Sequence, residues 1–192
     1  MAMELKKPEI TLKPRVEKTE GSHSEKKEFT NPFASKECID LLNFRIEQEE
    51  LSSRLYQAMS LWLNDNGFMG AAKAWLKDAE GEMEHAGWAK EFLLDMGVQP
   101  KLPTLAMPVQ KFEGLCDIIE QSYAHEIVVT TQCNDLAKHA MTYGNHLLYQ
   151  LAIKYLQEQQ EELGKLQTLL DKLTAFGEDK IALRLLDTEL GA

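Results

Sequence analysis

The stretch 97–108, GVQPKLPTLAMP, constrains the fold of this chain more than any other segment. Its three prolines do not continue a helix, yet the sequence on both sides of it has a helical pattern. Shorter breaks, rich in Gly, Asn or Asp, occur at 64–67, 143–145 and 176–179. Together the breaks predict four long helices and a short one, over residues 35–64, 67–96, 111–141, 146–174 and 179–190.

The lengths of the connections predict how these helices are arranged. The first and third connections are short, so each joins two antiparallel neighbours. The second connection has about fourteen residues and reaches about 46 Å when extended, while a thirty-residue helix is roughly 45 Å long. It can therefore run the length of a bundle and start the third helix parallel to the second. The predicted fold class is all-α, a four-helix bundle with one long crossover and a short fifth C-terminal helix.

The first part of the chain differs in composition from the rest. Residues 1–34 contain three prolines, many charged residues and no helical period. A segment with so little apolar surface does not fold by itself. We therefore expect a flexible N-terminal tail over 1–34 and a single four-helix domain with its short fifth helix over 35–192.

The composition excludes several classes of partner and location. The formal net charge is −10, so we expect no nucleic-acid partner, whereas cations are attracted. No apolar run is long enough to cross a membrane, and the first thirty residues lack the apolar region of a secretory signal. Three widely spaced cysteines without a CxxC motif favour reduced thiols in the cytoplasm.

Each long helix carries a polar interruption near the middle of the seam that its apolar residues form. The interrupting residues are Glu49 in the first helix, Glu82 and His85 in the second, Glu126 in the third, and Gln159 and Glu162 in the fourth. Like charges gathered in a core do not all stay ionised unless cations lie among them. Oxygen-rich ligation with one imidazole suits iron or manganese better than zinc. The pattern therefore favours two divalent ions inside the bundle.

Four segments carry a resemblance to a known family. They are EELSSRLYQAMSLWL (49–63), EMEHAGWAKEF (82–92), YAHEIVVT (123–130) and EQQEE (158–162). In order and spacing they are similar to segments of the bacterial non-haem ferritins, which the chain resembles from about Leu41 to its end. This resemblance implies a ferritin-like bundle and a homo-oligomeric cage, expected to have 24 subunits. The segment EDKIALRLLDTEL (178–190) resembles the fifth helix, which in that family packs at the four-fold contacts of the cage.

The resemblance also implies roles for the interrupting residues. The first iron of a ferroxidase centre is expected to be held by Glu49, Glu82 and His85. Glu82 is expected to bridge to a second iron, whose other ligands are Glu126 and Glu162, with Gln159 nearby. Tyr56 falls where the family keeps a tyrosine beside the centre; it is either an extra electron donor or an aromatic side chain that fills the seam.

A third iron site is left open by the sequence. Glu158 and Glu161, together with Glu162 and Glu49, could hold a third iron of the kind that bacterial members often bind. Gly81 stands where the family has an extra acid, just before the bridging glutamate. We therefore expect third-site binding to be weak or absent.

Haem is not expected, although Met83 lies beside Glu82, where the haem-binding relatives also carry a methionine. Those relatives have a second ExxH motif in the fourth helix, and this chain has Gln159-x-x-Glu162 there instead. The same difference argues against the peroxidases and oxygenases that use two ExxH motifs. For His125 the sequence does not decide between a position beside the centre and one on the surface.

The function that the resemblance implies is iron storage. Fe(II) would be oxidised at an intrasubunit di-iron ferroxidase centre by dioxygen, or by peroxide, and the ferric product stored as mineral inside the cage. The alternative is a non-mineralising di-iron redox protein of the same superfamily. A third hypothesis is a structural bundle that no longer binds metal.

Overall fold

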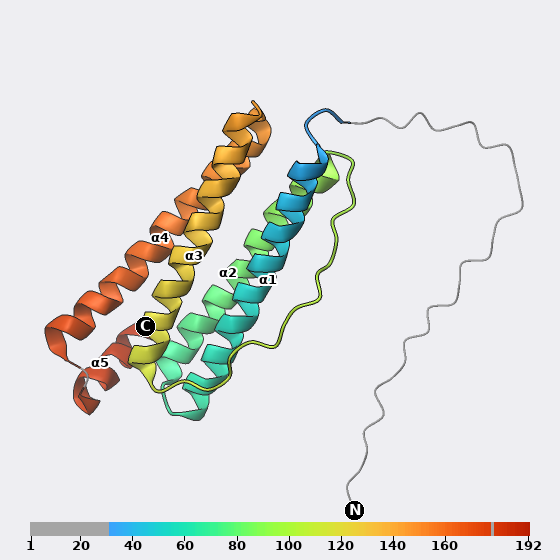
Figure 1. Cartoon of the computed structure of the whole chain (residues 1–192). Helices are drawn as coiled ribbons and strands as arrows, with labels where there is room; N and C mark the ends of the chain where they lie inside the picture. The colour runs from blue at the N-terminus through green and yellow to red at the C-terminus, as the bar shows by residue number, and fades with distance from the viewer. Residues whose placement is uncertain (1–30, 178) are drawn as a thin grey trace, which may run out of the picture. The chain divides into compact units, whose positions relative to one another are not determined.

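The computed structural model describes residues 31–177 and 179–192, and within them it contains helices and no strands. The helices are α1 (Lys36–Asp65), α2 (Met69–Asp95), α3 (Leu115–Thr142), α4 (His146–Phe176) and α5 (Lys180–Leu190). Figure 1 shows α1 beside α2 and α3 beside α4, with α2 and α3 running in the same direction. The predicted all-α bundle with one long crossover and a short fifth helix is confirmed. No described helix is both long and apolar enough to span a membrane.

The crossover connects α2 to α3 along the side of α1 (Figure 1). Near its start, the backbone N–H of Lys101 donates to Asn43 Oδ1 of α1 at 2.8 Å. Near its end, Phe112 is buried, and its ring packs edge-on against Trp62 with 6.1 Å between the ring centroids. The third helix was predicted from residue 111, and this start is wrong by about one turn. Residues 111–114 stay outside the helix because the buried Phe112 anchors the crossover to α1.

The helix ends follow ordinary capping chemistry where the sequence supplies it. Ser35 caps α1 by accepting from the backbone N–H of Cys38 at 3.2 Å. Asn145 caps α4 in the same way, and Asp179 accepts from two backbone N–H groups at the start of α5. A side-chain acceptor at this position satisfies an N–H that has no partner within the helix. Residues 1–30 of the predicted tail lie outside the described residues.

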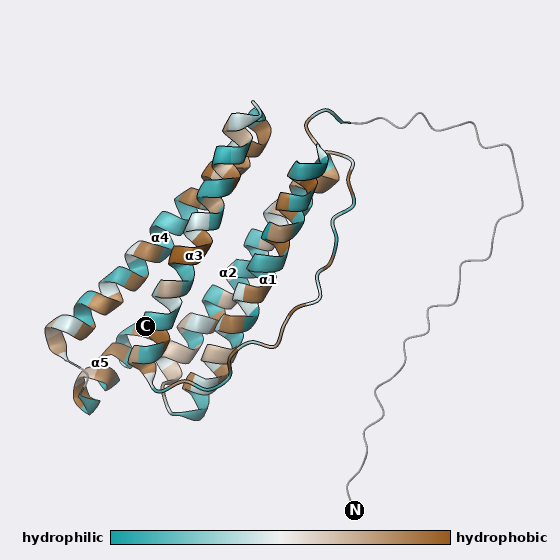
Figure 2. Cartoon of the chain, viewed as in Figure 1, coloured by the Kyte–Doolittle hydropathy of each residue, from teal (hydrophilic) through white to brown (hydrophobic). Residues whose placement is uncertain are grey.

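The buried apolar residues form two separate clusters rather than one continuous core. One cluster fills the end of the bundle near α5 and includes Met59, Trp75 and Ile119. The other fills the opposite end and includes Ile46 and Leu148. Each helix is brown on some residues and teal on others in Figure 2, as expected for amphipathic helices in a bundle. The middle of the bundle, between the two clusters, is where the polar interruptions lie.

The short helix α5 is docked on the beginning of α2. Its Asp187 Oδ1 accepts from the backbone N–H of Ala71 at 2.8 Å, and its Leu186 is buried in the cluster at this end of the bundle. The two backbones approach closely at Gly70 and Gly191, where an added Cβ on either glycine would lie within 3 Å of the other helix end. Glycine at these two positions therefore permits the docking.

Candidate metal centre

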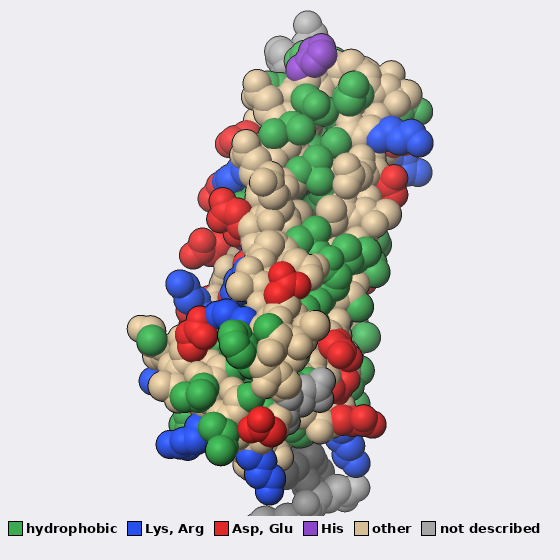
Figure 3. Space-filling view, turned by 90° about the vertical axis from the view of Figure 1, so that its left-hand side faces the viewer, with side chains coloured by type: hydrophobic (Ala, Val, Ile, Leu, Met, Phe, Trp, Pro, Cys, Tyr) green, Lys and Arg blue, Asp and Glu red, His purple; other side chains and the backbone are tan. Residues whose placement is uncertain are grey.

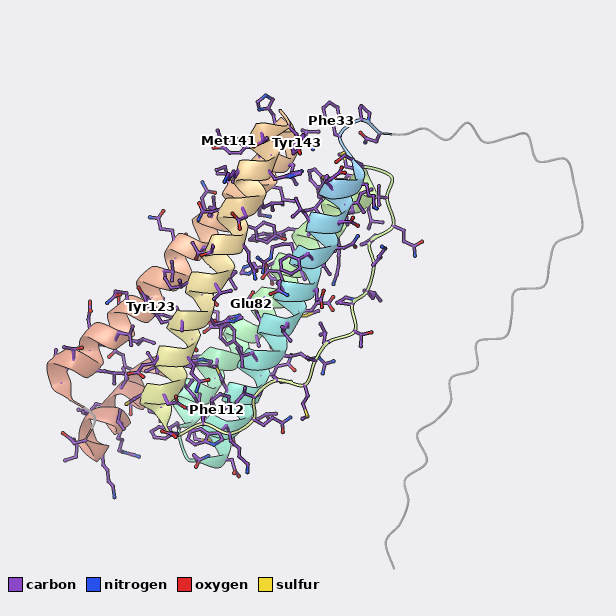
Figure 4. The ribbon with its side chains drawn as sticks, viewed as in Figure 1. Phe33, Glu82, Phe112, Tyr123, Met141 and Tyr143 are labelled. Carbon is purple, nitrogen blue, oxygen red and sulfur yellow. The ribbon has the colours of Figure 1, made fainter. Side chains whose placement is uncertain are left out.

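The polar interruptions meet in the interior, one set from each long helix. Glu49, Glu82, His85, Glu126 and Gln159 are all buried, and the most exposed of them, His85, is only 7% exposed. Figure 4 shows Glu82 midway along the helices, inside the bundle. On each helix, the polar residue occupies a position where the helical period would place an apolar one. It therefore faces the interior, between the two apolar clusters.

Three of these side chains are close enough to share one cation. Glu49, Glu82 and His85 each offer a ligand atom, and these atoms all lie within 4.8 Å of one another. His85 Nδ1 lies 3.2 Å from Glu82 Oε2. Glu49 Oε2 is buried and has no hydrogen-bond partner. Buried carboxylate oxygens are almost always satisfied, so this unpartnered oxygen fits a site built for a metal ion.

Glu126 of α3 accepts hydrogen bonds from two uncharged side chains. Its Oε1 accepts from the Tyr56 hydroxyl, and its Oε2 accepts from Gln159 Nε2 at 3.1 Å. The amide of Gln159 is fixed in turn, because its Oε1 accepts from Thr130 Oγ1 at 2.8 Å. This chain of hydrogen bonds orients the Glu126 carboxylate without giving it a basic partner.

The predicted glutamate ligands of α4 lie nearer to solvent than the other residues of the centre. Glu162 is half-buried, and its Oε2 lies 3.6 Å from Lys165 Nζ. Glu158 is also half-buried, with Oε1 3.8 Å from His85 Nε2. Glu161 is exposed. The structure thus places Glu162 and Glu158 at the edge of the centre and leaves Glu161 on the surface of α4.

Three carboxyl groups, those of Glu49, Glu82 and Glu162, have pKa values shifted toward the protonated form. Burial raises the pKa of Glu82 to about 8; the adjacent Glu49 carboxyl opposes the shift, and the charges of Glu126 and Glu162 reinforce it. Burial also raises the pKa of Glu49 well above its usual value, against the opposing charge of Arg45. For Glu162, burial again raises the pKa. The metal-free centre therefore holds protons that a bound cation would displace.

This shift predicts how the stability of the metal-free protein depends on pH. A glutamate whose pKa is raised on folding stabilises the folded state below its ordinary value of 4.5, and that contribution is lost as the pH rises through about 8. We expect the Tm of chelator-treated protein to fall between these pH values. Glu82→Gln should flatten the curve because the amide does not ionise, whereas Glu84→Gln, at an exposed position of the same helix, should not. A pH profile of Glu82→Gln as steep as that of the wild type would contradict the role given to Glu82.

Sequence analysis missed two basic residues at the centre. Arg45 is buried, with Nε 2.8 Å from Glu49 Oε1 and Nη1 2.9 Å from Gln132 Oε1. Lys165 forms ion pairs with Asp78 and Glu162. The available signal was helical spacing, since Arg45 precedes Glu49 by four residues and Lys165 follows Glu162 by three.

Several aromatic groups surround the centre. The ring of His85 lies 4.6 Å from that of Trp88, which in turn lies 5.3 Å from Tyr155. The Tyr155 hydroxyl donates to the backbone carbonyl of His85 at 2.7 Å. His125 lies beside the centre, with its ring 5.9 Å from that of Tyr56 and Nε2 2.7 Å from Ser52 Oγ. These contacts fix the positions of His85 and Tyr56.

Comparison with known proteins supports a single family. Residues 39–176 match the family described as the ferritin-like domain. The bacterial non-heme ferritin of Escherichia coli O6:H1 is 33% identical over 154 residues, covering 80% of this chain and 93% of that protein. The probable bacterial non-heme ferritin-like protein of Haemophilus influenzae is 32% identical over 157 residues, covering 82% of this chain and 95% of that protein.

Comparison with a solved structure also indicates the ferritin family. The open pore ferritin of the hyperthermophilic archaeon Archaeoglobus fulgidus superposes with a TM-score of 0.79 at 29% identity, covering 82% of this chain and 97% of that one. The match extends over almost the whole neighbour, so it includes the bundle and its crossover. By sequence and by structure, this chain belongs to the ferritin family, with bacterial non-haem ferritins as its relatives.

Proposed function

We propose that this protein is an iron-storage ferroxidase, which binds Fe(II) in the middle of the bundle and oxidises it before storage. The observation that carries the proposal is the buried triad of Glu49, Glu82 and His85 with its unpartnered carboxylate oxygen. A cluster of buried acids has no structural advantage by itself, because removing charges from water costs free energy that only counter-charges offset. Iron cations supply that counter-charge.

The ligand assignment follows the resemblance to the family, and the close grouping of Glu49, Glu82 and His85 supports its first part. The first Fe(II) would be bound by Glu49, Glu82 and His85. The second Fe(II) would share Glu82 and be bound further by Glu126 and Glu162, with Gln159 orienting Glu126. Glu158 and Glu161, together with Glu162 and Glu49, would hold a third iron only weakly, because Gly81 supplies no extra acid beside Glu82 and Glu161 is exposed.

The chemistry of the site is one-electron oxidation of two ions. Two Fe(II) each lose one electron, and one dioxygen gains both electrons and two protons to give hydrogen peroxide. Carboxylates and imidazole favour this because hard oxygen donors stabilise the ferric product. The protons held by Glu49 and Glu82 leave when the cations bind, and the hydrogen bond from Tyr56 keeps Glu126 facing the second position.

Storage of a mineral requires an assembly of several subunits. The bundle has an exposed apolar surface that could pack against other copies of the chain. Phe176, Ile181 and Leu185 line an apolar groove between the end of α4 and α5 and are each at least 66% exposed. Figure 3 shows hydrophobic side chains gathered along one face of the bundle, between acidic and basic groups. Exposed apolar patches of this kind mark interaction surfaces. We propose a cage of 24 copies in the cytoplasm, which needs no nucleic acid, membrane or haem.

Size and iron content together test this proposal. With subunits of 21.8 kDa, a closed cage of 24 copies has a mass of about 0.5 MDa. We expect size-exclusion chromatography with light scattering to give that mass, and aerobically added Fe(II) to elute with the protein as ferric iron. A dimer that oxidises Fe(II) but retains no mineral would instead support the non-mineralising redox protein.

A further inference from the structure

Two basic side chains are paired with carboxylates of the proposed centre, one with a carboxylate of α1 and one with a carboxylate of α4. Arg45 Nε lies 2.8 Å from Glu49 Oε1, and Lys165 Nζ lies 3.6 Å from Glu162 Oε2. Each cation partly offsets the charge of an acid that we assign as an iron ligand. The two pairs differ in how firmly the cation is held, and this difference has consequences for metal binding.

Arg45 is buried and hydrogen-bonded to α3 through Nη1, while its Nε and Nη2 make no hydrogen bond. It is 2% exposed, and its Nη1 donates to Gln132 Oε1 at 2.9 Å and to Cys133 Sγ at 3.7 Å. It engages Glu49 through Oε1 and leaves the buried Oε2 without a partner. A metal ion can therefore use Oε2 while the guanidinium stays where it is.

Lys165 is placed differently. Its side chain is 39% exposed, and besides Glu162 it forms a closer ion pair with Asp78 of α2. Asp78 precedes Glu82 by four residues, so this second partner stands one helical turn away from the proposed bridging ligand. The ammonium is therefore already held by a second carboxylate, and it can lose Glu162 while Asp78 continues to compensate its charge.

We propose that Lys165 is a displaceable counter-ion, which pairs with both Asp78 and Glu162 in the metal-free centre and gives up Glu162 while it keeps Asp78 when the second cation binds. This inference rests on the proposed function, since it takes Glu162 as a ligand of the second iron. Its consequence is that the second position binds more weakly than the first, because a cation there has to displace Lys165 and stand near its charge. Loading is therefore sequential, with Glu49, Glu82 and His85 filled first.

Titration of the full-length assembly with Co²⁺ tests this inference. Co²⁺ accepts the same oxygen and nitrogen ligands and is not oxidised by air under these conditions, so calorimetry reports binding alone. We expect a tighter and a weaker step in the wild type. In Lys165→Met, which keeps the length of the side chain without its charge, the weaker step should tighten about tenfold, as expected for loss of a partly screened repulsion. The tighter step should not change.

Two further variants separate this role from a general effect of charge. Lys172→Met removes a lysine of the same helix that pairs with Glu189 instead, and it should change neither step. Asp78→Asn should weaken the second step in the wild type, because Lys165 loses its closer partner and is left with Glu162 alone. In the Lys165→Met background the same substitution should have less than half that effect on the binding constant.

The outcomes are distinguishable from failure of the proposed function. If Lys165→Met leaves the weaker step unchanged or weakens it, Lys165 is not a displaceable counter-ion, although the centre itself can stand. An Asp78→Asn effect of the same size in both backgrounds would overturn the inference as well. If Glu82→Ala leaves both steps of the wild type intact, the centre has been assigned to the wrong residues and the proposed function fails first.

Discussion

Replacing Glu82 by alanine is expected to slow the initial oxidation of Fe(II) by more than about 100-fold. Glu82 is buried between α1 and His85 and is the carboxylate that we assign to both iron positions. Loss of a group that only supports a metal ligand already lowers affinity or activity 10- to 100-fold, and loss of a shared ligand should exceed that. The measurement is ferric absorbance by stopped-flow mixing of the protein with Fe(II) in air.

The matched control for this variant lies two residues away. Glu84 is on the same helix but is exposed, so Glu84→Ala removes an equal charge without touching the centre and should oxidise Fe(II) at the wild-type rate. Both variants should keep the size of the wild-type assembly, since neither position lies in an apolar cluster. Equal rates for Glu82→Ala and Glu84→Ala would show that oxidation occurs elsewhere.

The fold could be predicted from the sequence because two local signals agreed. The breaks at 64–67 and 143–145 are turns that glycines in a left-handed conformation close, at Gly67 and Gly144. The Pro-rich stretch is long enough to run the length of the bundle, which predicted that the third helix runs parallel to the second. The start of α3 was missed because the burial of Phe112 depends on a contact with Trp62, and a contact so distant in sequence has no local pattern.

The helical period alone predicted that the acids face the interior. It did not predict which side chains contact them there. Glu49 and Glu126 could be placed facing inward, and both are buried. The spacing of four residues allowed Arg45 to pair with Glu49, but it did not indicate that the pair would be buried, because an arginine on a helix is far more often at the surface. Its burial depends on Gln132 of another helix, and such a tertiary hydrogen bond becomes visible only when the helices are placed together.

The substitution Gly70→Ala, at the contact between α2 and α5, is expected to lower the free energy of unfolding substantially. A Cβ added to Gly70 would lie 1.8 Å from the backbone oxygen of Asp187 and 2.9 Å from the backbone nitrogen of Gly191. Because both contacts are with backbone atoms, no change of side-chain rotamer relieves them, and Gly70→Ala should push α5 off the bundle. The protein then loses the hydrogen bond from Ala71 and the burial of Leu186, together about 2–4 kcal/mol of unfolding free energy.

Denaturant unfolding and hydrogen exchange measure this effect, and Gly87 supplies the control. Gly87 lies within the same helix, but a Cβ there meets nothing within 4 Å, so Gly87→Ala should stabilise the protein by about 0.5–1 kcal/mol through helix propensity. In Gly70→Ala, amides of residues 180–190 should lose protection while those of α1 keep theirs, because a helix of eleven residues is not stable alone. Since the apolar Ile181 and Leu185 of α5 are exposed in the single chain, its release should also shift the assembly to smaller species. Wild-type protection of α5 in Gly70→Ala would mean that the contact between Gly70 and Asp187 does not exist in solution.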